Sequence, residues 1–470
     1  MAMLGKRRPP RPASGHSGLA RQQTAKPSNQ ATQDSAALVV ERLAHDGRGV
    51  AHTAAGKTVF IDQALPGEHV EVAVHLTRKR YDEAHVKQVL NPSAQRVSPP
   101  CPHFGHCGGC DLQHLAVASQ RAHKEDVVRD LFARQGITLG AMESLHGEAQ
   151  GYRRRARLGV KVDGDGHPRL GFRAAHSHRL VDIESCLVLV EPLQELITPL
   201  RGLLNTLEAP RQVGHVELLA TDTQRVVLVR QLKANAADAE RWQAFADQHQ
   251  LALGTWLGRE SPELHWHGAP PSLEERLEIP GATPLTLTFA PGDFLQVNAE
   301  VNQQMVTTVM RWLNPVPGQR LMDLFAGIGN FSLPLAAAGA AVHAVEGSPA
   351  MVARLASNAE QNQLAVSGQQ LDLSDPDTVT ALLRDEGDRD ALVLDPPRSG
   401  AEAICQALAR RPVPRVVYIS CDPATLARDA AHLVHAGYRI KHIAVADMFM
   451  HTAHMETLML FEHTECVSTP

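Results

Sequence analysis

The stretch DLFAGIGNF, at residues 323–331 of this 470-residue chain, decides the fold of the C-terminal part. It follows the apolar run Leu321–Leu324, which predicts a strand, and it precedes a run typical of a helix. Glycines let a backbone approach a ligand closely, and the first N–H groups of a helix are free to bind it. Glu346 ends the next predicted strand, where a carboxylate accepts hydrogen bonds from both hydroxyls of a ribose. The pattern therefore predicts a nucleotide-like cofactor at one edge of a sheet.

The strands around this loop alternate with helical runs, which predicts a parallel sheet in a doubly wound α/β fold. The further predicted strands are Ala341–Glu346, Ala391–Asp395, Val416–Cys421, Ile440–Ala446 and Thr457–Phe461. A pyrophosphate loop has a third glycine where this chain has Ser332, which disfavours a dinucleotide. With Asp323 before it and Glu346 after it, the loop resembles the S-adenosylmethionine loop of Rossmann-like methyltransferases. Dinucleotide binding and a plain strand-to-helix turn remain as alternatives.

The net charge conceals an uneven distribution along the chain. Lys and Arg number 46 against 51 Asp and Glu, and the formal net charge of −5 alone argues against a nucleic-acid partner. However, residues 1–33 carry six basic groups and no acid, and residues 151–180 carry eight basic groups and two acids. Such asymmetry indicates local contact with a polyanion. No apolar run is long enough to span a membrane and no secretory signal is present, so we expect a cytoplasmic protein, with a mitochondrial transit peptide as the less favoured alternative.

The N-terminal part divides into a tail, a barrel and a central domain. Residues 1–34, rich in Pro, Gln, Ser and Arg, are predicted to form a disordered basic tail. Short alternating strands with Gly and Pro turns predict an OB-like β-barrel for single-stranded RNA over residues 35–98, with the basic residues 78–80 on its rim. Residues 99–290 are predicted to form a central α+β domain that includes a helix over Val117–Gln135. Residues 291–470 carry the doubly wound sheet.

Two residues offer covalent chemistry near the glycine loop. Cys421 ends a predicted strand just before a helix, where we expect a lowered thiol pKa, although a plain buried cysteine is the alternative. Addition of a thiolate to C6 of uracil makes C5 nucleophilic, after which a general base must remove the C5 proton. Glu456, before the last predicted strand, is the candidate base. Cys405 and Cys466 are predicted to have no chemical role.

The runs SCDPATLARD at residues 420–429 and DMFMHTAHME at residues 447–456 resemble the nucleophile and base motifs of the RNA uracil-C5 methyltransferases, and FLQVN at residues 294–298 resembles their entry to the catalytic domain. The resemblance implies Cys421 as nucleophile and Glu456 as base. It implies S-adenosylmethionine contacts from Gln296, Phe325, Asn330, Glu346 and Asp372, a contact to the cofactor or the target uracil from Asp395, and stacking near the flipped base by Phe294. The family usually has Asn and Pro where this chain has Asp422 and Met450.

A cluster of cysteines lies near the start of the central domain. Cys101, Cys107 and Cys110 fall within ten residues, and Cys186 is available farther along. Four thiolates suit either tetrahedral zinc or an iron–sulfur cluster, and a site that holds no metal is a further alternative. Zinc ribbons usually pair two short C-x-x-C units, whereas this chain has one, which disfavours zinc. The cluster also resembles the [4Fe-4S] site of the same methyltransferase group, which implies these four cysteines as iron ligands with a structural role.

The barrel resembles a TRAM domain, and the combination of barrel, cluster and catalytic domain resembles the family members that act on 23S ribosomal RNA. The resemblance implies methyl transfer from S-adenosylmethionine to C5 of one specific uridine through a covalent cysteine adduct. It also implies 23S ribosomal RNA as the partner of a monomer that has no membrane contact. Two alternatives remain: the same reaction at another rRNA site or in tRNA, and a non-catalytic RNA-binding assembly factor that has kept the fold.

Overall fold

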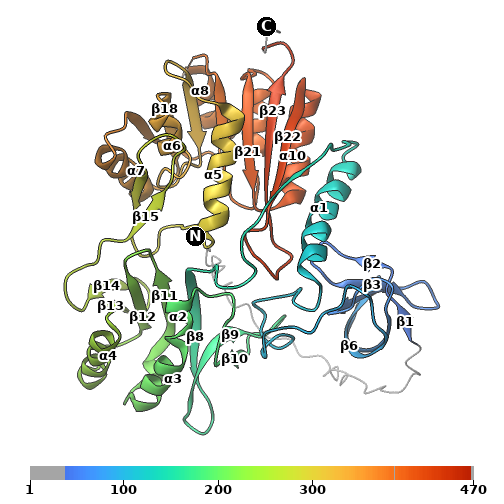
Figure 1. The fold of residues 1–470 in the computed structure, drawn as a ribbon, viewed down its shortest axis with the longest axis vertical. Coiled ribbons are helices and arrows are strands. Elements are labelled where there is room, and N and C mark those ends of the chain that lie inside the picture. The colour runs from blue at the N-terminus through green and yellow to red at the C-terminus, as the bar shows by residue number, and fades with distance from the viewer. Residues whose placement is uncertain (1–36, 386, 467–470) are drawn as a thin grey trace, which may run out of the picture.

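The structure is a computed structural model, and it describes residues 37–385 and 387–466. The predicted disordered tail lies outside the described residues. The described residues form three large sheets and one two-stranded sheet, with a helix between two of the large ones (Figure 1). The C-terminal sheet occupies the yellow-to-red part at the top, the central sheet the green part, and the N-terminal sheet the blue part.

The N-terminal sheet has six strands in the order β1-β5-β6-β4-β3-β2. The strands are β1 Leu38–Val39, β2 Arg42–Leu43, β3 Gly49–His52, β4 Thr58–Asp62, β5 His69–Thr77 and β6 Tyr81–Asn91. No strand pairing among the described residues joins β1 to β2, so a closed barrel is not observed. The two edge strands, β1 and β2, are consecutive parts of one short segment, so β1 pairs with β5 and β2 pairs with β3, and they do not pair with each other. Within this segment, the Val40 N–H donates to Glu68 and the Glu41 N–H donates to Val50, so the chain crosses from β5 to β3 and the sheet curls back on itself.

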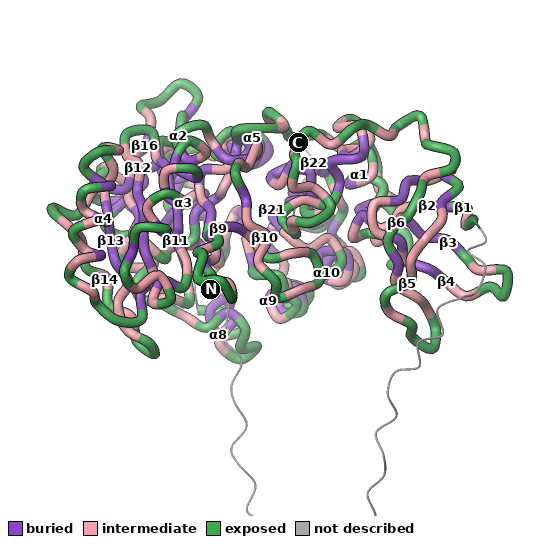
Figure 2. Tube along the Cα trace, turned by 90° about the horizontal axis from the view of Figure 1, so that it is seen from below, coloured by how far each residue is buried: buried purple, intermediate pink, exposed green. Residues whose placement is uncertain are grey.

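The central sheet has seven strands in the order β10-β9-β8-β11-β12-β13-β14. Its strands are β8 Arg155–Val162, β9 Pro168–Arg173, β10 Leu180–Asp182, β11 Val213–Ala220, β12 Arg225–Gln231, β13 Ala252–Leu257 and β14 Glu263–Trp266. The helices are α2 Glu191–Gln194, α3 Ile197–Thr206 and α4 Ala236–His249, with a 3₁₀ turn at Pro210–Gln212. Leu204 and Trp242 from these helices pack on Leu158 and Leu218 of the sheet, which buries one face (Figure 2). A two-stranded sheet of β15 Glu274–Leu277 and β16 Leu285–Thr288 follows.

The C-terminal sheet has eight strands in the order β19-β18-β17-β20-β21-β23-β22-β7. The strands are β7 Glu143–Leu145, β17 Arg320–Leu324, β18 Ala341–Glu346, β19 Val366–Gln370, β20 Ala391–Leu394, β21 Arg415–Ser420, β22 Tyr438–Ala446 and β23 Glu456–His463. The pairings are parallel except those of β23, which runs antiparallel to both of its neighbours. The expectation of a doubly wound parallel sheet is therefore confirmed with one reversed strand.

Helices cover both faces of this sheet, as a doubly wound fold requires. Along β20, Ala391 and Val393 join one apolar cluster whereas Leu392 and Leu394 join the other, because successive side chains of a strand point to opposite faces. The helices are α5 Ala299–Leu313, α6 Ser332–Ala337, α7 Pro349–Gln361, α8 Pro376–Asp385, α9 Glu402–Leu408 and α10 Pro423–His435. Helix α1, Val117–Arg134, lies between this sheet and the N-terminal sheet and buries Val128 and Phe132 in the second cluster (Figure 1).

The predicted domain limits at residues 34, 98 and 290 stay predictions, although each sheet falls within one predicted range apart from β7 of the C-terminal sheet. Among the residues described, no helix combines the length and the apolar character needed to cross a bilayer.

A buried ion pair joins the central sheet to the small sheet, and it provides a test of the packing. Arg154 is 8% exposed and donates from Nη2 to Oε1 of Glu275 at 2.6 Å and from Nε to the Gln296 carbonyl at 2.9 Å. Loss of one partner leaves a buried uncompensated charge, so we expect Arg154→Met to lower the free energy of unfolding in urea by about 3–5 kcal/mol. The double variant Arg154→Met/Glu275→Leu should recover most of this loss.

The matched control is Arg276→Met, which breaks the exposed pair between Arg276 and Glu278. This change should cost less than about 1 kcal/mol, because exposed pairs are screened by water. An Arg154→Met variant no less stable than Arg276→Met would contradict the proposed importance of the buried pair.

Candidate active site

The glycine loop is held in a strained turn at the carboxyl end of β17. Phe325 has φ 65°, a value that non-glycine residues rarely adopt, and Gly327 and Gly329 have φ 57° and 104°. The N–H groups of Phe325 and Ala326 both donate to the carbonyl of Val345 on β18. Backbone strain of this kind persists where the surroundings impose it, and it is concentrated at ligand sites. The structure thus gives the predicted cofactor loop a fixed shape.

Glu346 closes this loop from the end of β18. Its Oε2 accepts the Gly327 N–H at 3.1 Å, and its Oε1 accepts the Ser348 N–H at 2.9 Å. A carboxylate has about four acceptor positions, so these two bonds leave capacity for the hydroxyls of a ribose. Asp372 follows β19, the neighbouring strand, but it is exposed and its Oδ1 accepts from Ser374, which lowers its pKa.

A buried polar network connects Asn330 of the glycine loop with the backbone of Gln296. Asn330 exchanges two side-chain hydrogen bonds with Asn302 of α5, at 2.9 and 3.0 Å. Asn302 also donates to Glu275 at 3.3 Å, and Glu275 pairs with Arg154, which in turn binds the carbonyl of Gln296. The network connects two predicted cofactor contacts to the central sheet. Phe294 lies near this segment and is 61% exposed.

Two aspartates at the strand ends hold protons more tightly than usual. Burial raises the pKa of Asp323 to about 7 despite the hydrogen bond from Ser332 Oγ, and the nearby Glu346 raises it further. Desolvation raises the pKa of Asp395 to about 7 as well, and Asp323 adds to this effect. Asp395 follows β20, so both acids lie at the edge of the sheet where the glycine loop begins.

The antiparallel direction of β23 brings Cys421 and Glu456 together. Ser420, the last residue of β21, pairs with Thr457 of β23. Because the two strands are antiparallel, continuing this register by one position brings Cys421, which follows Ser420, opposite Glu456, which precedes Thr457. Cys421 is half-buried, and Glu456 is 5% exposed. The charge of Glu456 raises the pKa of Cys421 and the charge of Asp395 raises the pKa of Glu456, which indicates that the three groups lie close to one another.

The expected lowered pKa of Cys421 is wrong. Burial, followed by the negative charges of Glu456 and Asp395, raises the pKa of this thiol to about 11. Two of the first N–H groups of α10 already have a partner, because the Oδ1 of Asp422 accepts those of Ala424 and Thr425 and caps the helix. Asn and Asp both make this cap, so the departure from the usual Asn keeps the local structure.

Arg398 is a site residue to which the sequence analysis assigned no role. Its positive charge lowers the pKa values of both Cys421 and Glu456, against the effect of burial. It is exposed and lines the same cavity as Cys421. The available signal was its place in the run DPPR, directly after the strand that ends before Asp395.

The four clustered cysteines also come together. Burial, with smaller contributions from the charges of Cys107 and Cys101, raises the pKa of Cys110 to about 12 and that of Cys186 to about 11. The side chain of Gln113 hydrogen-bonds to Cys110, and its Oε1 accepts the Cys101 N–H at 3.2 Å. Within residues 37–385 and 387–466, however, no group of three or more His, Cys, Asp or Glu side chains is arranged to hold a metal ion.

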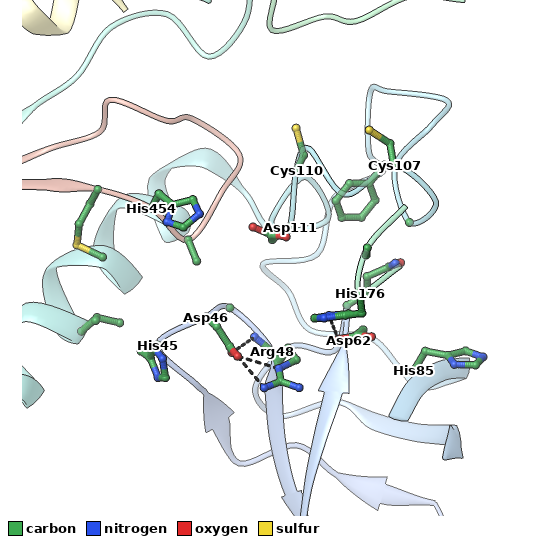
Figure 3. A pocket seen from close by; sticks show the side chains of 18 of the residues that line it. His45, Asp46, Arg48, Asp62, His85, Cys107, Cys110, Asp111, His176 and His454 are labelled. Carbon is green, nitrogen blue, oxygen red and sulfur yellow. Dashed lines mark hydrogen bonds and ion pairs between the residues drawn. The ribbon is translucent and has the colours of Figure 1, made fainter. Parts of the chain in front are cut away.

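We call residues 101–113 the cysteine loop. A cavity of about 1260 Å³ extends from Cys421 past this loop to the N-terminal sheet (Figure 3). The charged groups that line it include four arginines and four aspartates, so Arg and Asp balance; they are Arg48, Arg134, Arg179, Arg398, Asp46, Asp62, Asp111 and Asp422. Six histidines also line it: His45, His75, His85, His106, His176 and His454. Some of these groups are paired with each other, since Arg48 binds Asp46 and His176 lies 3.8 Å from Asp62.

The basic segment 151–180 is less available to a polyanion than its charge indicates. Arg155 and Arg157 both bind the buried carboxylate of Glu217, and Arg169 binds Asp163. By contrast, residues 78–80 are exposed between β5 and β6, as expected for a basic rim.

Comparison with known proteins identifies two matching families. The model for tRNA (Uracil-5-)-methyltransferase matches residues 117–464, and the TRAM domain model matches residues 38–87. A protein of Halomonas elongata named 23S rRNA (uracil(1939)-C(5))-methyltransferase RlmD is 56% identical over 99% of this chain and 98% of its own length. A protein of the same name from Chromohalobacter salexigens is 53% identical over 98% of this chain and 95% of its own length.

Among solved structures, the tRNA (uracil-54, C5)-methyltransferase of Pyrococcus abyssi, in complex with S-adenosyl-L-homocysteine, has the same fold. It superposes with a TM-score of 0.70 at 22% identity, over 90% of this chain and 100% of that structure.

The buried Asp323 predicts a dependence of stability on pH. Its pKa is raised above the ordinary value of 3.8 to about 7, so the folded protein keeps a proton that the unfolded chain releases. The contribution to stability is complete below pH 3.8 and is lost as the pH rises through 7. Between pH 5 and pH 8, we expect the free energy of unfolding to fall by about 3 kcal/mol more in the wild type than in Asp323→Asn.

Urea titrations at several pH values measure this difference. The control is Asp372→Asn, which removes an exposed carboxylate whose pKa is lowered. Parallel pH curves for the wild type and Asp323→Asn would show that Asp323 does not hold the proton.

Proposed function

The chain belongs to the tRNA (uracil-5-)-methyltransferase family, and we propose that it transfers a methyl group from S-adenosylmethionine to C5 of one uridine in 23S ribosomal RNA. The observation that carries this proposal is the meeting of Cys421 and Glu456 across β21 and β23, beside the glycine loop. The choice of 23S ribosomal RNA rather than tRNA is supported by the full-length relatives, whose names specify uracil 1939.

The chemistry follows from the low nucleophilicity of C5 in uracil. The thiolate of Cys421 forms a bond to C6, and the electron pair of the C5–C6 double bond moves into an enolate. S-adenosylmethionine supplies an electrophilic methyl group, which C5 takes as the sulfur–methyl bond breaks. Glu456 then accepts the C5 proton, the C6–sulfur bond breaks, and 5-methyluridine leaves with the thiolate restored.

Charges around Cys421 and Glu456 shift the pKa values of both side chains. Burial and the two nearby acids raise the pKa of the Cys421 thiol, whereas the positive charge of Arg398 lowers it and so favours the thiolate that attacks C6. Burial and the charge of Asp395 also raise the pKa of Glu456 well above its ordinary value, so its carboxylate binds a proton strongly once it is ionised. A carboxylate with a raised pKa suits the removal of a proton from carbon.

The methyl donor fits the edge formed by β17, β18 and β19. We assign its contacts to Gln296, Phe325, Asn330, Glu346 and Asp372, with Asp395 between donor and uracil. The acceptor capacity of Glu346 and the strained turn at Phe325 support this assignment. The exposed position of Asp372 supports it least.

We also propose that Cys101, Cys107, Cys110 and Cys186 hold a [4Fe-4S] cluster. The donor set supports this, because four thiols lie together on a loop and on the segment after β10, and their mutual repulsion contributes to the raised pKa values of Cys107, Cys110 and Cys186. A metal ion would remove this repulsion by binding the thiolates. The cluster would fix the cysteine loop and would take no part in the transfer of the methyl group.

RNA would enter through the cavity between the N-terminal sheet and Cys421. The TRAM match and the exposed residues 78–80 support contacts outside the cavity. A cytoplasmic location and a monomeric state stay predictions.

The first test of this function replaces the nucleophile. Cys421→Ala should abolish transfer of labelled methyl groups to a 23S ribosomal RNA transcript, because no thiolate activates C5. Cys466→Ala, which changes an exposed cysteine outside the site, is the control and should retain full activity. Full transfer by Cys421→Ala would contradict the covalent mechanism, and an inactive wild type would favour a non-catalytic binding role.

The second test replaces the base. Glu456→Gln keeps the shape of the side chain but accepts no proton from C5, so a methylated protein–RNA adduct should accumulate and survive denaturing gel electrophoresis. The double variant Cys421→Ala/Glu456→Gln should form none. If Glu456→Gln turns over at the wild-type rate, Glu456 is not the base.

The third test concerns the metal. Anaerobically purified protein should contain about four iron and four sulfide per chain, and Cys110→Ser should lose most of both, since each cysteine ligates one iron. Cys466→Ser is the matched control with unchanged iron. Zinc in place of iron in the wild type would contradict the assignment.

A further inference from the structure

The loop of residues 447–455 connects β22 to β23 and ends directly before Glu456. We call it the base loop. Its backbone departs from a simple turn, because His451 has φ 65°, which is unfavourable for a side chain of this size. Such a conformation persists only where neighbouring structure holds it. The contacts that hold this loop therefore bear on where the carboxylate of Glu456 lies.

A buried ion pair anchors the first residue of the base loop. Lys124 of α1 is 1% exposed, and its Nζ lies 2.5 Å from Oδ1 of Asp447, which is 2% exposed. The same ammonium group donates to the carbonyl of Phe449 at 3.1 Å. Arg121, one turn earlier on α1, lies 3.6 Å from the other oxygen of Asp447. A lysine this buried is rare unless it is paired, so the pair fixes the loop to α1.

The middle of the base loop is anchored by other elements. The N–H groups of Asp111 and Leu112, immediately after Cys110, both donate to the carbonyl of His451 at 2.9 Å. The hydroxyl of Tyr152 donates to the carbonyl of Met450 at 3.0 Å. Figure 3 shows Asp111 between Cys110 and the turn that carries His454. The base loop is thus bound to α1 at one end and to the cysteine loop in its middle.

We propose that Lys124 is a positioning residue for the base: its ion pair with Asp447 fixes the base loop so that Glu456 stays opposite Cys421. This inference rests on the proposed function. It assigns Lys124 no contact with the RNA, because the side chain is enclosed by α1 and the base loop. The role is specific to the late step, since Cys421 does not belong to the base loop: it lies between the end of β21 at Ser420 and the N-cap of α10 at Asp422.

The placement predicts which step fails when the pair is lost. A displacement of about 1 Å in a catalytic group costs on the order of 100-fold in rate. Lys124→Met keeps the length of the side chain and removes its charge. We expect this variant to form the methylated adduct within about three-fold of the wild-type rate, and to release 5-methyluridine at least about ten-fold more slowly. The adduct should therefore accumulate, as in Glu456→Gln.

The measurement is a single turnover with labelled S-adenosylmethionine and a 23S ribosomal RNA fragment, in which adduct and free methylated RNA are quantified on denaturing gels. Arg129→Met, which removes an exposed charge from the same helix, is the control and should behave as wild type. Lys124→Arg, which keeps the cation, should restore release to within about three-fold. If Lys124→Met does not fold, Asp447→Asn compared with Lys124→Arg decides in the same way.

A general loss of stability would slow adduct formation and release equally, and that result would overturn the inference, as would wild-type release by Lys124→Met. Failure of the proposed function looks different, because the wild type itself would then form neither adduct nor 5-methyluridine.

Discussion

The antiparallel direction of β23 determines which residues meet at the candidate active site. In a sheet made only of parallel strands, the first residue of β23 would lie at the amino edge, opposite the end of β21. Because β23 runs antiparallel between β21 and β22, its first residue, Glu456, lies at the carboxyl edge beside Cys421. Ligands bind at the carboxyl edge of such sheets, and the reversal brings Glu456, Cys421 and the glycine loop together at that edge.

Three parts of the structure bind the segments at this edge: helix α1, the cysteine loop and the central sheet. Helix α1 binds the base loop through Lys124, and the cysteine loop binds it through the N–H groups that follow Cys110. The central sheet reaches the glycine loop through Arg154, Glu275 and the two asparagines. These contacts are buried and polar, so they give the site a defined geometry more than they give the protein net stability. The cysteine loop and the candidate active site are therefore connected by hydrogen bonds to the base loop.

The sequence predicts much of this fold because its signals are local. Strand Ala341–Glu346 has the predicted limits, and helix α1 ends one residue early, since long apolar runs and regular periodicity define such elements. The direction of β23 was not predictable, because a run of alternating apolar residues carries no information about the direction of its partner.

The raised pKa of Cys421 depends on acids 26 residues before and 35 residues after it, and the expectation of a lowered value considered only the adjacent helix. The pairing of Arg155 and Arg157 with Glu217 likewise joins residues about 60 positions apart. The placement of Cys421 and Glu456 matches the predicted pair, whereas their roles remain to be tested.

The most direct test of the account is the mass of the protein after reaction with a 23S ribosomal RNA fragment that carries 5-fluorouridine at the target position. Fluorine cannot leave C5 as a proton does, so the reaction should stop after methyl transfer. The account predicts a denaturation-stable complex whose mass equals protein plus RNA plus one methyl group less the thiol proton, with the RNA attached to the peptide that contains Cys421. A complex attached to another residue, or no complex with an RNA that the protein methylates when it carries uridine, would contradict the account.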